Sequence, residues 1–209
     1  MRLTVTVGGK TITYCGVCNC KHRWRSTLAV WRLVMNIAVL YDSYYGHTKE
    51  MAHEVAAGAE SVEGVVVQCK SIEEASRKDL QWADGIAVGC PTHMGSPAWR
   101  MKRFIDEEFS QMWLRHELVG KVGTTFTTGG SGGAGGSELA QLALLANFAQ
   151  QGMVLVTLPR NTPGFQPDGM AWGATWATGR GHEPPTESQR GSAQAQGRLL
   201  AEVTKKLRG

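Results

Sequence analysis

The sequence predicts an α/β protein, in which a parallel β-sheet carries helices on both of its faces. Short apolar runs rich in β-branched or small residues alternate along the chain with stretches that have the periodicity of helices. Strands that alternate with helices at this spacing form right-handed βαβ units and build a parallel sheet. The composition agrees, because 42% hydrophobic and 19% charged residues are typical of a globular protein with a sizeable core.

The first strand–helix unit has the pattern of an anion-binding site. Residues 37–41 form an apolar run, which a loop of small and hydroxylated residues, Ser43 to Thr48, joins to a helical pattern. Free N–H groups would gather there at the positive end of the helix dipole. Gly46 would let the backbone approach an anion closely. The loop lacks the Gly-Lys-Ser/Thr of an ATP- or GTP-binding loop. A phosphate site and an ordinary capped turn both remain open.

The remaining elements follow in order along the chain. The further strands are expected at residues 64–69, 85–89, 121–127 and 153–157. The further helices are expected within residues 70–80, where only a short one fits, and at residues 98–108, 137–151 and 188–207. Ser96 and Pro97 are expected to cap and open the helix at residue 98. Residues 158–187 are expected to form a long irregular loop.

Five parallel strands of this kind suit the order 2-1-3-4-5 of a flavodoxin-like three-layer sandwich. Such sheets bind ligands at the carboxyl ends of strands 1, 3 and 4, where the strand order reverses. The loops that leave these three strands are rich in glycine, hydroxyl groups or aromatic rings, and they comprise residues 43–48, 90–96 and 128–136. Three loops of the same character at one edge of the sheet predict a bound ligand.

The first 34 residues differ from the rest in charge. Residues 1–34 contain six Lys or Arg and no Asp or Glu, so the net charge of +4 leaves −2 for residues 35–209. We therefore interpret residues 1–34 as a basic extension outside the core and residues 35–209 as one flavodoxin-like α/β domain. Alternating residues between Arg2 and Tyr14 predict a hairpin within the extension. We infer no nucleic-acid binding from the overall charge.

The cysteines indicate no disulfide framework, because five of them are unevenly spaced. A reducing cytoplasm is the expected location. Cys15, Cys18 and Cys20 have the close spacing of a metal-binding knuckle, but structural zinc sites usually take two separated ligand pairs. An extension without metal is the favoured interpretation, with the knuckle as the alternative. No apolar run is long enough to span a membrane, so no membrane insertion is expected.

Several motifs resemble those of WrbA-type NAD(P)H:quinone oxidoreductases, a flavodoxin-like family of FMN proteins. The most specific are Ser-x-Tyr-Gly-His at residues 43–47 and Pro-Thr-x-x-Gly at residues 91–95. The others are Trp113, the loop at residues 127–138, Gln-Gly-Met at residues 151–153 and Trp-Gly-Ala at residues 172–174. The resemblance covers residues 36–208 and leaves out the basic extension.

The resemblance implies that three loops bind FMN. The phosphate would be held by Ser43, Tyr44, Tyr45, Gly46, His47 and Thr48. The isoalloxazine would be lined by Pro91, Thr92, His93, Met94 and Gly95. The ring edge and ribityl chain would be bordered by Thr128, Gly129, Gly130, Ser131, Gly132 and Gly133. The nicotinamide or quinone would be flanked by Tyr45 and Trp113. The family typically forms homotetramers whose subunits partly close one another's pockets.

The chain departs from the family at two places near the expected flavin. Where the family has Arg-Phe, this chain has His93 and Met94, so a thioether contact replaces ring stacking. Where the family has His-His-Gly-Met, this chain has Gln151, which can hydrogen-bond but cannot titrate near neutral pH. His93 and Gln151 are therefore candidates for contact with the flavin or quinone, and no residue is a certain catalytic group. A loop histidine without a role is the alternative for His93.

The implied function is the two-electron reduction of quinones by NAD(P)H. Hydride would pass from the nicotinamide to the flavin N5 and, after the oxidised nucleotide leaves, to the quinone, which is a ping-pong mechanism. Two alternatives remain open: a flavodoxin-like electron carrier, and a non-catalytic FMN-binding or adaptor protein. No arginine pair is recognisable that would bind a 2′-phosphate, so the sequence does not distinguish NADH from NADPH.

Overall fold

The structure, a computed structural model, describes residues 2–7, 10–15, 34–130, 136–162, 165, 171–179 and 183–208. The chain divides into two units, residues 1–32 and 33–209. In the first unit, β1 (Arg2–Val7) pairs with β2 (Lys10–Cys15) as the predicted antiparallel hairpin. Cys18 and Cys20 of the possible metal knuckle lie outside the described residues.

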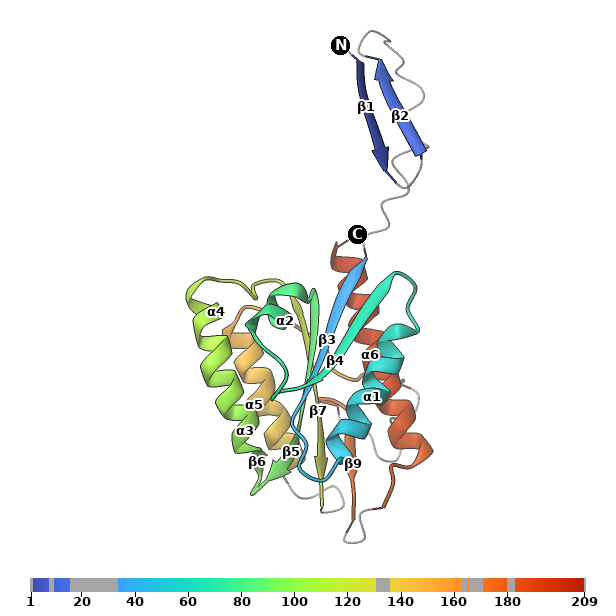
Figure 1. Cartoon of the computed structure of the whole chain (residues 1–209). Coiled ribbons are helices and arrows are strands. Elements are labelled where there is room, and N and C mark those ends of the chain that lie inside the picture. The colour runs from blue at the N-terminus through green and yellow to red at the C-terminus, as the bar shows by residue number, and fades with distance from the viewer. Residues whose placement is uncertain are drawn as a thin grey trace. The chain divides into compact units, whose positions relative to one another are not determined.

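The second unit is built on a sheet in which β4, β3, β5, β7 and β8 lie side by side in that order (Figure 1). All four pairings along this path are parallel. The strands are β3 (Met35–Tyr41), β4 (Val65–Ser71), β5 (Gly85–His93), β7 (Val122–Gly129) and β8 (Val154–Leu155). Numbered by their order in the second unit, they give 2-1-3-4-5, so the predicted flavodoxin-like fold is confirmed.

The last strand is shorter than the sequence predicted, and a second segment continues it. β8 pairs only with the start of β7, at Val122 and Gly123. Further along β7, the segment β9 (Thr175–Ala177) pairs in parallel with residues Thr127 to Gly129. The edge of the sheet is therefore made of two pieces from distant parts of the sequence. The expectation of an irregular loop throughout residues 158–187 is wrong at β9.

A second correction concerns Ser96 and Pro97, which form the short strand β6 (Ser96–Pro97) and not the start of a helix. β6 folds back antiparallel onto the end of β5, with Thr92 opposite Pro97. The reversal is possible because Met94 and Gly95 both have positive φ, of 48° and 74°. The next helix begins only at Trp99.

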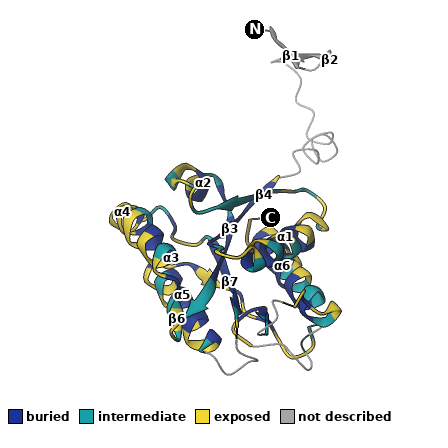
Figure 2. Ribbon diagram, turned by 60° about the horizontal axis from the view of Figure 1, so that its bottom comes forward, coloured by how far each residue is buried: buried dark blue, intermediate teal, exposed yellow. Residues whose placement is uncertain are grey.

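Helices cover both faces of the sheet (Figure 1). One face carries α1 (His47–Glu60) and α6 (Glu187–Arg208). The other carries α2 (Arg77–Trp82), α3 (Trp99–Phe104), the π-helix η1 (Ile105–Phe109), α4 (Ser110–Leu114) and α5 (Ser137–Gln150). Alternate residues of the central strand β3 enter the two cores: Ile37 and Val39 face α1 and α6, while Ala38 and Leu40 face the opposite layer. Figure 2 shows buried residues along the sheet and exposed residues on the outer helix faces.

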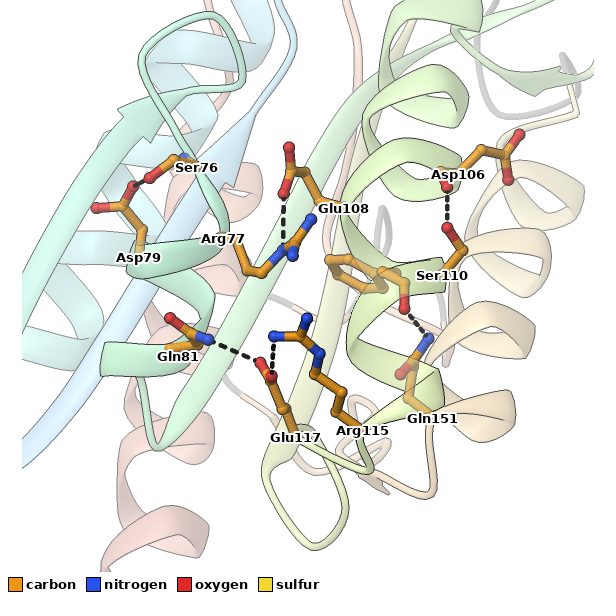
Figure 3. A network of polar contacts seen from close by, with 11 residues as sticks. Ser76, Arg77, Asp79, Gln81, Asp106, Glu108, Ser110, Arg115, Glu117 and Gln151 are labelled. Carbon is orange, nitrogen blue, oxygen red and sulfur yellow. Dashed lines mark hydrogen bonds and ion pairs between the residues drawn. The ribbon is translucent and has the colours of Figure 1, made fainter.

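The helix expected at residues 98–108 starts one residue later and continues to Leu114, with a π-helical turn in its middle. Polar contacts link this long helical run to α2 (Figure 3). Arg77 Nε lies 3.4 Å from the carboxylate of Glu108, and Gln81 Nε2 donates to Glu117 at 2.8 Å. These contacts hold α2 against the helical run and the turn that follows it.

The two long helices on the other face touch through glycine. A Cβ added to Gly58 of α1 would lie 1.9 Å from the carbonyl oxygen of Gln194. A Cβ added to Gly197 of α6 would lie 1.8 Å from the carbonyl oxygen of Val55. Backbone meets backbone at both places, so no side chain can turn away to make room.

We predict that Gly197→Ala lowers the free energy of unfolding by about 1–3 kcal/mol, because the added methyl group must push α1 and α6 apart. Urea denaturation measures the change. Gly191→Ala is the matched control, since it lies in the same helix with nothing within 4 Å of an added Cβ. It should raise the free energy of unfolding by about 0.5–1 kcal/mol through helix propensity. Equal effects of the two substitutions would contradict the close approach.

The short helix α2 begins with a capping box. The carboxylate of Asp79 accepts hydrogen bonds from the backbone N–H of Ser76 at 2.8 Å and from its hydroxyl at 3.0 Å. The ammonium group of Lys70, at the end of β4, also donates to this carboxylate. Burial would raise the pKa of Asp79, but the hydrogen bonds from Lys70 and Ser76 outweigh it, so the pKa lies below its ordinary value.

We predict that Asp79→Asn removes stability only where Asp79 is ionised. A carboxyl whose folded pKa is depressed stabilises the fold above its unfolded pKa of about 4, and this contribution is lost as the pH falls through the folded pKa. Asp79→Asn should therefore cost about 1 kcal/mol at pH 7, the difference between charged and neutral hydrogen bonds. The cost should disappear toward about pH 2. Denaturation of both proteins across this range tests it, and a pH-independent cost would contradict it.

Candidate functional site

Three loops and the end of β9 meet in one pocket at the carboxyl edge of the sheet. The pocket has a volume of about 200 Å³. It is lined by Tyr45, His47, Pro91, Thr92, His93, Thr128, Gly129, Gly130, Thr178 and Gly179. The structure therefore brings together residues from all three loops that the sequence singled out. The pocket lies where the chain leaves β3, β5 and β7, as expected for a sheet of this strand order.

The first loop turns tightly from β3 into α1. The hydroxyl oxygen of Ser43 accepts a hydrogen bond from the backbone N–H of Gly46 at 3.1 Å. Gly46 has φ of +91° and is the N-cap of α1, and nothing lies within 4 Å of where its Cβ would be. A ligand can therefore approach the backbone of Gly46, at the N-terminus of α1, from that side without meeting a side chain. Tyr45 is 77% exposed at the rim.

Hydroxyl groups join the three loops to one another. The hydroxyls of Thr48, in the first turn of α1, and Thr128, at the end of β7, form a buried hydrogen bond of 2.8 Å. The hydroxyl of Thr92, in the second loop, lies 3.2 Å from that of Ser137, which opens α5. These two contacts fix the loops at the spacing that makes the pocket.

The second loop places His93 and Met94 differently. His93 lines the pocket, and the centre of its ring lies 5.0 Å from the centre of the Tyr44 ring in the first loop. Met94 is fully exposed at the turn. Gly95 touches the third loop, because a Cβ on Gly136 would lie 2.5 Å from its Cα. Of the third loop, Gly129 and Gly130 line the pocket, whereas Ser131, Gly132 and Gly133 lie outside the described residues.

Sequence reasoning missed Thr178 and Gly179, which follow β9. The backbone N–H of Thr178 donates to the carbonyl oxygen of Gly129 at 2.8 Å, and so extends the sheet beside the third loop. A signal was present in the sequence, since a short β-prone run at Thr175–Ala177 ends in a hydroxyl residue and a glycine, like the other loops of the site. It was hidden inside a segment interpreted as irregular.

Two buried glutamines hold the chain that leads into β9. Gln196 of α6 accepts from the backbone N–H of Ala174 at 2.6 Å and donates to the hydroxyl of Thr124 and the carbonyl of Thr125, both at 2.6 Å. Gln141 of α5 donates to the carbonyl of Ala174 at 3.0 Å. Helices from both layers therefore determine where the fourth wall of the pocket lies.

Cys69 and Cys90 do not supply a nucleophile. Cys90 lies just before the second loop and is fully buried, and burial raises the pKa of its thiol to about 12. Burial likewise raises the pKa of Cys69 to about 11. Both therefore remain protonated near neutral pH.

Gln151 and Trp113 do not reach this pocket within one chain. They line a separate cavity of about 230 Å³ between the η1–α4 run and the end of α5. Gln151 is 7% exposed, and its side-chain N–H donates to the carbonyl of Phe109 at 2.9 Å (Figure 3). The carbonyl oxygen of the neighbouring Gly152 accepts a hydrogen bond from the backbone N–H of Gly120, two residues before β7. α5 begins beside the loops and is about 21 Å long, so this cavity lies at the opposite edge of the sheet.

Among the described residues, no group of three or more His, Cys, Asp or Glu side chains is placed to hold a metal ion. None of the helices in the described part of the chain is long and apolar enough to cross a membrane.

Known proteins share both the sequence and the fold. The flavodoxin family model matches residues 39–160, more than half of the chain. A curated NAD(P)H dehydrogenase (quinone) from Azorhizobium caulinodans is 34% identical over 199 residues, which cover 83% of this chain and 98% of that protein. A flavodoxin from Aquifex aeolicus is 47% identical over 90 residues, which cover 43% of this chain and 48% of that protein. The solved structure of a WrbA-like flavodoxin protein from Agrobacterium tumefaciens is 27% identical, with a TM-score of 0.64 and coverage of 82% and 98%.

The strand order, together with a pocket formed by loops at the switch point, defines a flavodoxin-like protein. The extent of the family match makes the assignment firm: this chain belongs to the flavodoxin family. Its sequence resemblance to the WrbA-type quinone oxidoreductases is confirmed by full-length relatives and by the WrbA-like structure.

We predict that Gly136→Ala disturbs the contact between the second and third loops. The new Cβ would collide with Gly95, so the free energy of unfolding should fall by about 1–3 kcal/mol beyond the cost of φ +85° itself. Gly120→Ala is the control, because it has φ of +77° but open space around the added Cβ. In NMR spectra, the amide signals of Thr92 and His93 should shift in Gly136→Ala and stay in place in Gly120→Ala. Unchanged signals in both would show that the loops do not touch.

Proposed function

We propose that this chain is an FMN-dependent NAD(P)H dehydrogenase that reduces quinones. The observation that carries the proposal is the convergence of the three loops on one pocket rich in backbone amides and hydroxyls. The relatives that match nearly their whole length support the activity, since the curated proteins of Azorhizobium caulinodans and Acidithiobacillus ferrooxidans are both named NAD(P)H dehydrogenase (quinone).

The residues present fit FMN at the first and third loops. Nothing lies within 4 Å of a Cβ added at Gly46 or Gly130, so the cofactor can approach the backbone at both places. Ser43 to Thr48 and the N-terminus of α1 would hold the phosphate through N–H and hydroxyl donors. Thr92, His93 and Gly129 would border the ring. When bound, FMN supplies the two-electron chemistry, accepting hydride and donating it onward.

The protein's own part is positioning. Tyr45 stands exposed at the rim, where its ring would lie beside the nicotinamide or the quinone. His93, held against Tyr44, can donate a hydrogen bond to a flavin or quinone oxygen. Cys90 is buried and protonated, so the proposed reaction does not use it as a covalent nucleophile.

In the proposed enzyme, Trp113 and Gln151 of one subunit would contribute to the loop pocket of a second copy of the chain. Trp113 is 45% exposed, and the cavity that it shares with Gln151 opens on the η1–α4–α5 face. In a homo-oligomer, and in a tetramer in particular, this face of one subunit would cover the loop pocket of another and close it to water. Light scattering of the purified protein determines the number of subunits.

A second candidate function is electron carriage without catalysis, and the Aquifex aeolicus protein favours it. That relative is named flavodoxin and is 47% identical over its matched residues. A carrier needs a separate reductase, whereas the proposed enzyme takes electrons from NAD(P)H directly. Oxidation of NADH or NADPH by the purified protein alone, with benzoquinone as acceptor, separates the two functions.

We predict that the protein binds FMN, that NADH or NADPH bleaches the bound flavin without oxygen, and that benzoquinone restores its colour. Steady-state rates over varied NAD(P)H and quinone should give parallel double-reciprocal lines, because the oxidised nucleotide leaves before quinone binds. Intersecting lines would rule out the ping-pong order. A flavin that stays oxidised with both nucleotides would support the carrier, and a protein that binds no FMN would support the adaptor.

A further inference from the structure

A buried carboxylate lies directly before the first loop. Asp42 follows β3 and is 1% exposed. Its backbone N–H donates a hydrogen bond to the carbonyl oxygen of Gly89 at 2.9 Å. One oxygen of its carboxylate accepts a hydrogen bond from Arg100 of α3 at 2.5 Å. The other oxygen is buried and has no hydrogen-bond partner among the described residues. A carboxylate in this position depends on Arg100 for the neutralisation of its charge.

The same guanidinium holds the start of the loop. The nitrogen that binds Asp42 also lies 3.3 Å from the carbonyl oxygen of Ser43. The guanidinium carbon stands 3.9 Å from the centre of the Tyr44 ring. The second terminal nitrogen donates to the exposed Glu73, in the turn after β4, at 2.9 Å. Arg100 thus contacts three successive residues, from Asp42 to Tyr44, and anchors them to α3.

The charges around Asp42 can be ranked. Burial raises the pKa of Asp42 above its ordinary value, because the hydrogen bond and charge of Arg100 and the charge of His93 offset the effect of burial only in part. Burial would lower the pKa of Arg100, but the attraction of Asp42 raises it, so the arginine stays charged. Glu73 is 70% exposed, so water screens most of its effect. The pair of Asp42 and Arg100 is therefore the main electrostatic feature behind the first loop.

We propose that Arg100 makes the first loop selective for a phosphorylated flavin, because it neutralises the buried carboxylate of Asp42 next to the place where the phosphate binds. The proposal rests on FMN as the cofactor of the proposed function. Without Arg100, nothing of comparable strength offsets the burial of Asp42, and above its raised pKa its carboxylate would repel a phosphate dianion through a poorly screened protein interior. An uncharged ribityl chain would not feel this repulsion. Arg100 is in this sense a positioning and specificity-determining residue, and it takes no part in hydride transfer.

The test compares FMN with riboflavin, which has the same ring and chain but no phosphate. Both are titrated into the apoprotein, and quenching of flavin fluorescence gives the two dissociation constants. Arg100→Met should weaken FMN binding at least tenfold and change riboflavin binding less than twofold. In the double variant Asp42→Asn with Arg100→Met, FMN affinity should return to within threefold of the unmodified protein. Far-UV circular dichroism and thermal unfolding of each apoprotein check the fold.

Arg103→Met is the matched control. Arg103 lies three residues further along α3, and its side chain is 63% exposed. Among the described residues it forms an ion pair with Glu107, at 2.8 Å. Its loss should change the affinity for neither flavin by more than twofold. Equal sensitivity of FMN affinity to Arg100→Met and Arg103→Met would overturn a specific role for Arg100.

Three further results would overturn the proposal. The first is an equal loss of FMN and riboflavin affinity in Arg100→Met, which would mean that the arginine only shapes the loop. The second is an unchanged FMN affinity. The third is a folded double variant as weak as Arg100→Met, because then the charge of Asp42 is not the cause. If Arg100→Met does not fold, Arg100→Lys and the double variant decide, since both must keep the preference for FMN. An unmodified protein that binds neither flavin would refute the proposed function instead.

Discussion

Parallel pairing on both sides of β3 is the constraint on which the rest of the structure depends. β3 pairs with β4 on one side and with β5 on the other. The connection that leaves β3 therefore runs toward one edge of the sheet, and the connection that leaves β5 runs toward the other. The connections at the carboxyl ends diverge there, and a crevice opens between them. The candidate site lies in that crevice. Three segments border the crevice: the first loop, the second loop and the end of β7.

The crevice alone would be loose, and short polar contacts give it a fixed shape. The hydroxyl pairs Thr48–Thr128 and Thr92–Ser137 join loops that are far apart in the sequence. Gln196 and Gln141 hold the segment that enters β9, which supplies the remaining wall. Buried amides and hydroxyls that hydrogen-bond between segments rigidify a site in this way, because breaking these bonds would leave polar groups unpaired at a cost in free energy. The pocket is therefore organised before a ligand arrives.

Much of the fold could be predicted because its signals are local. Apolar runs located β3, β4, β5 and β7 to within a few residues, and the alternation of strands and helices predicted the parallel order. The sequence-based predictions are wrong where contacts between residues far apart in the sequence determine the local structure. Ser96 and Pro97 look like a helix start, but they pair with the end of β5 after two residues of positive φ. The η1 turn lies inside an ordinary helical pattern, and the carbonyl of Phe109 accepts a hydrogen bond from Gln151, 42 residues further on.

The sequence by itself determined the fold class, the strand order and the three loops of the pocket, because periodicity, glycine and hydroxyl residues act on their immediate neighbours. Only the tertiary structure decided which side chains share a site. It added Thr178 and Gly179 to the pocket, moved Gln151 and Trp113 to the far edge of the sheet, and paired Asp42 with Arg100. The physical reason is that these contacts join residues separated by tens of positions. Their distance is set by how helices pack on the sheet, which no local pattern encodes.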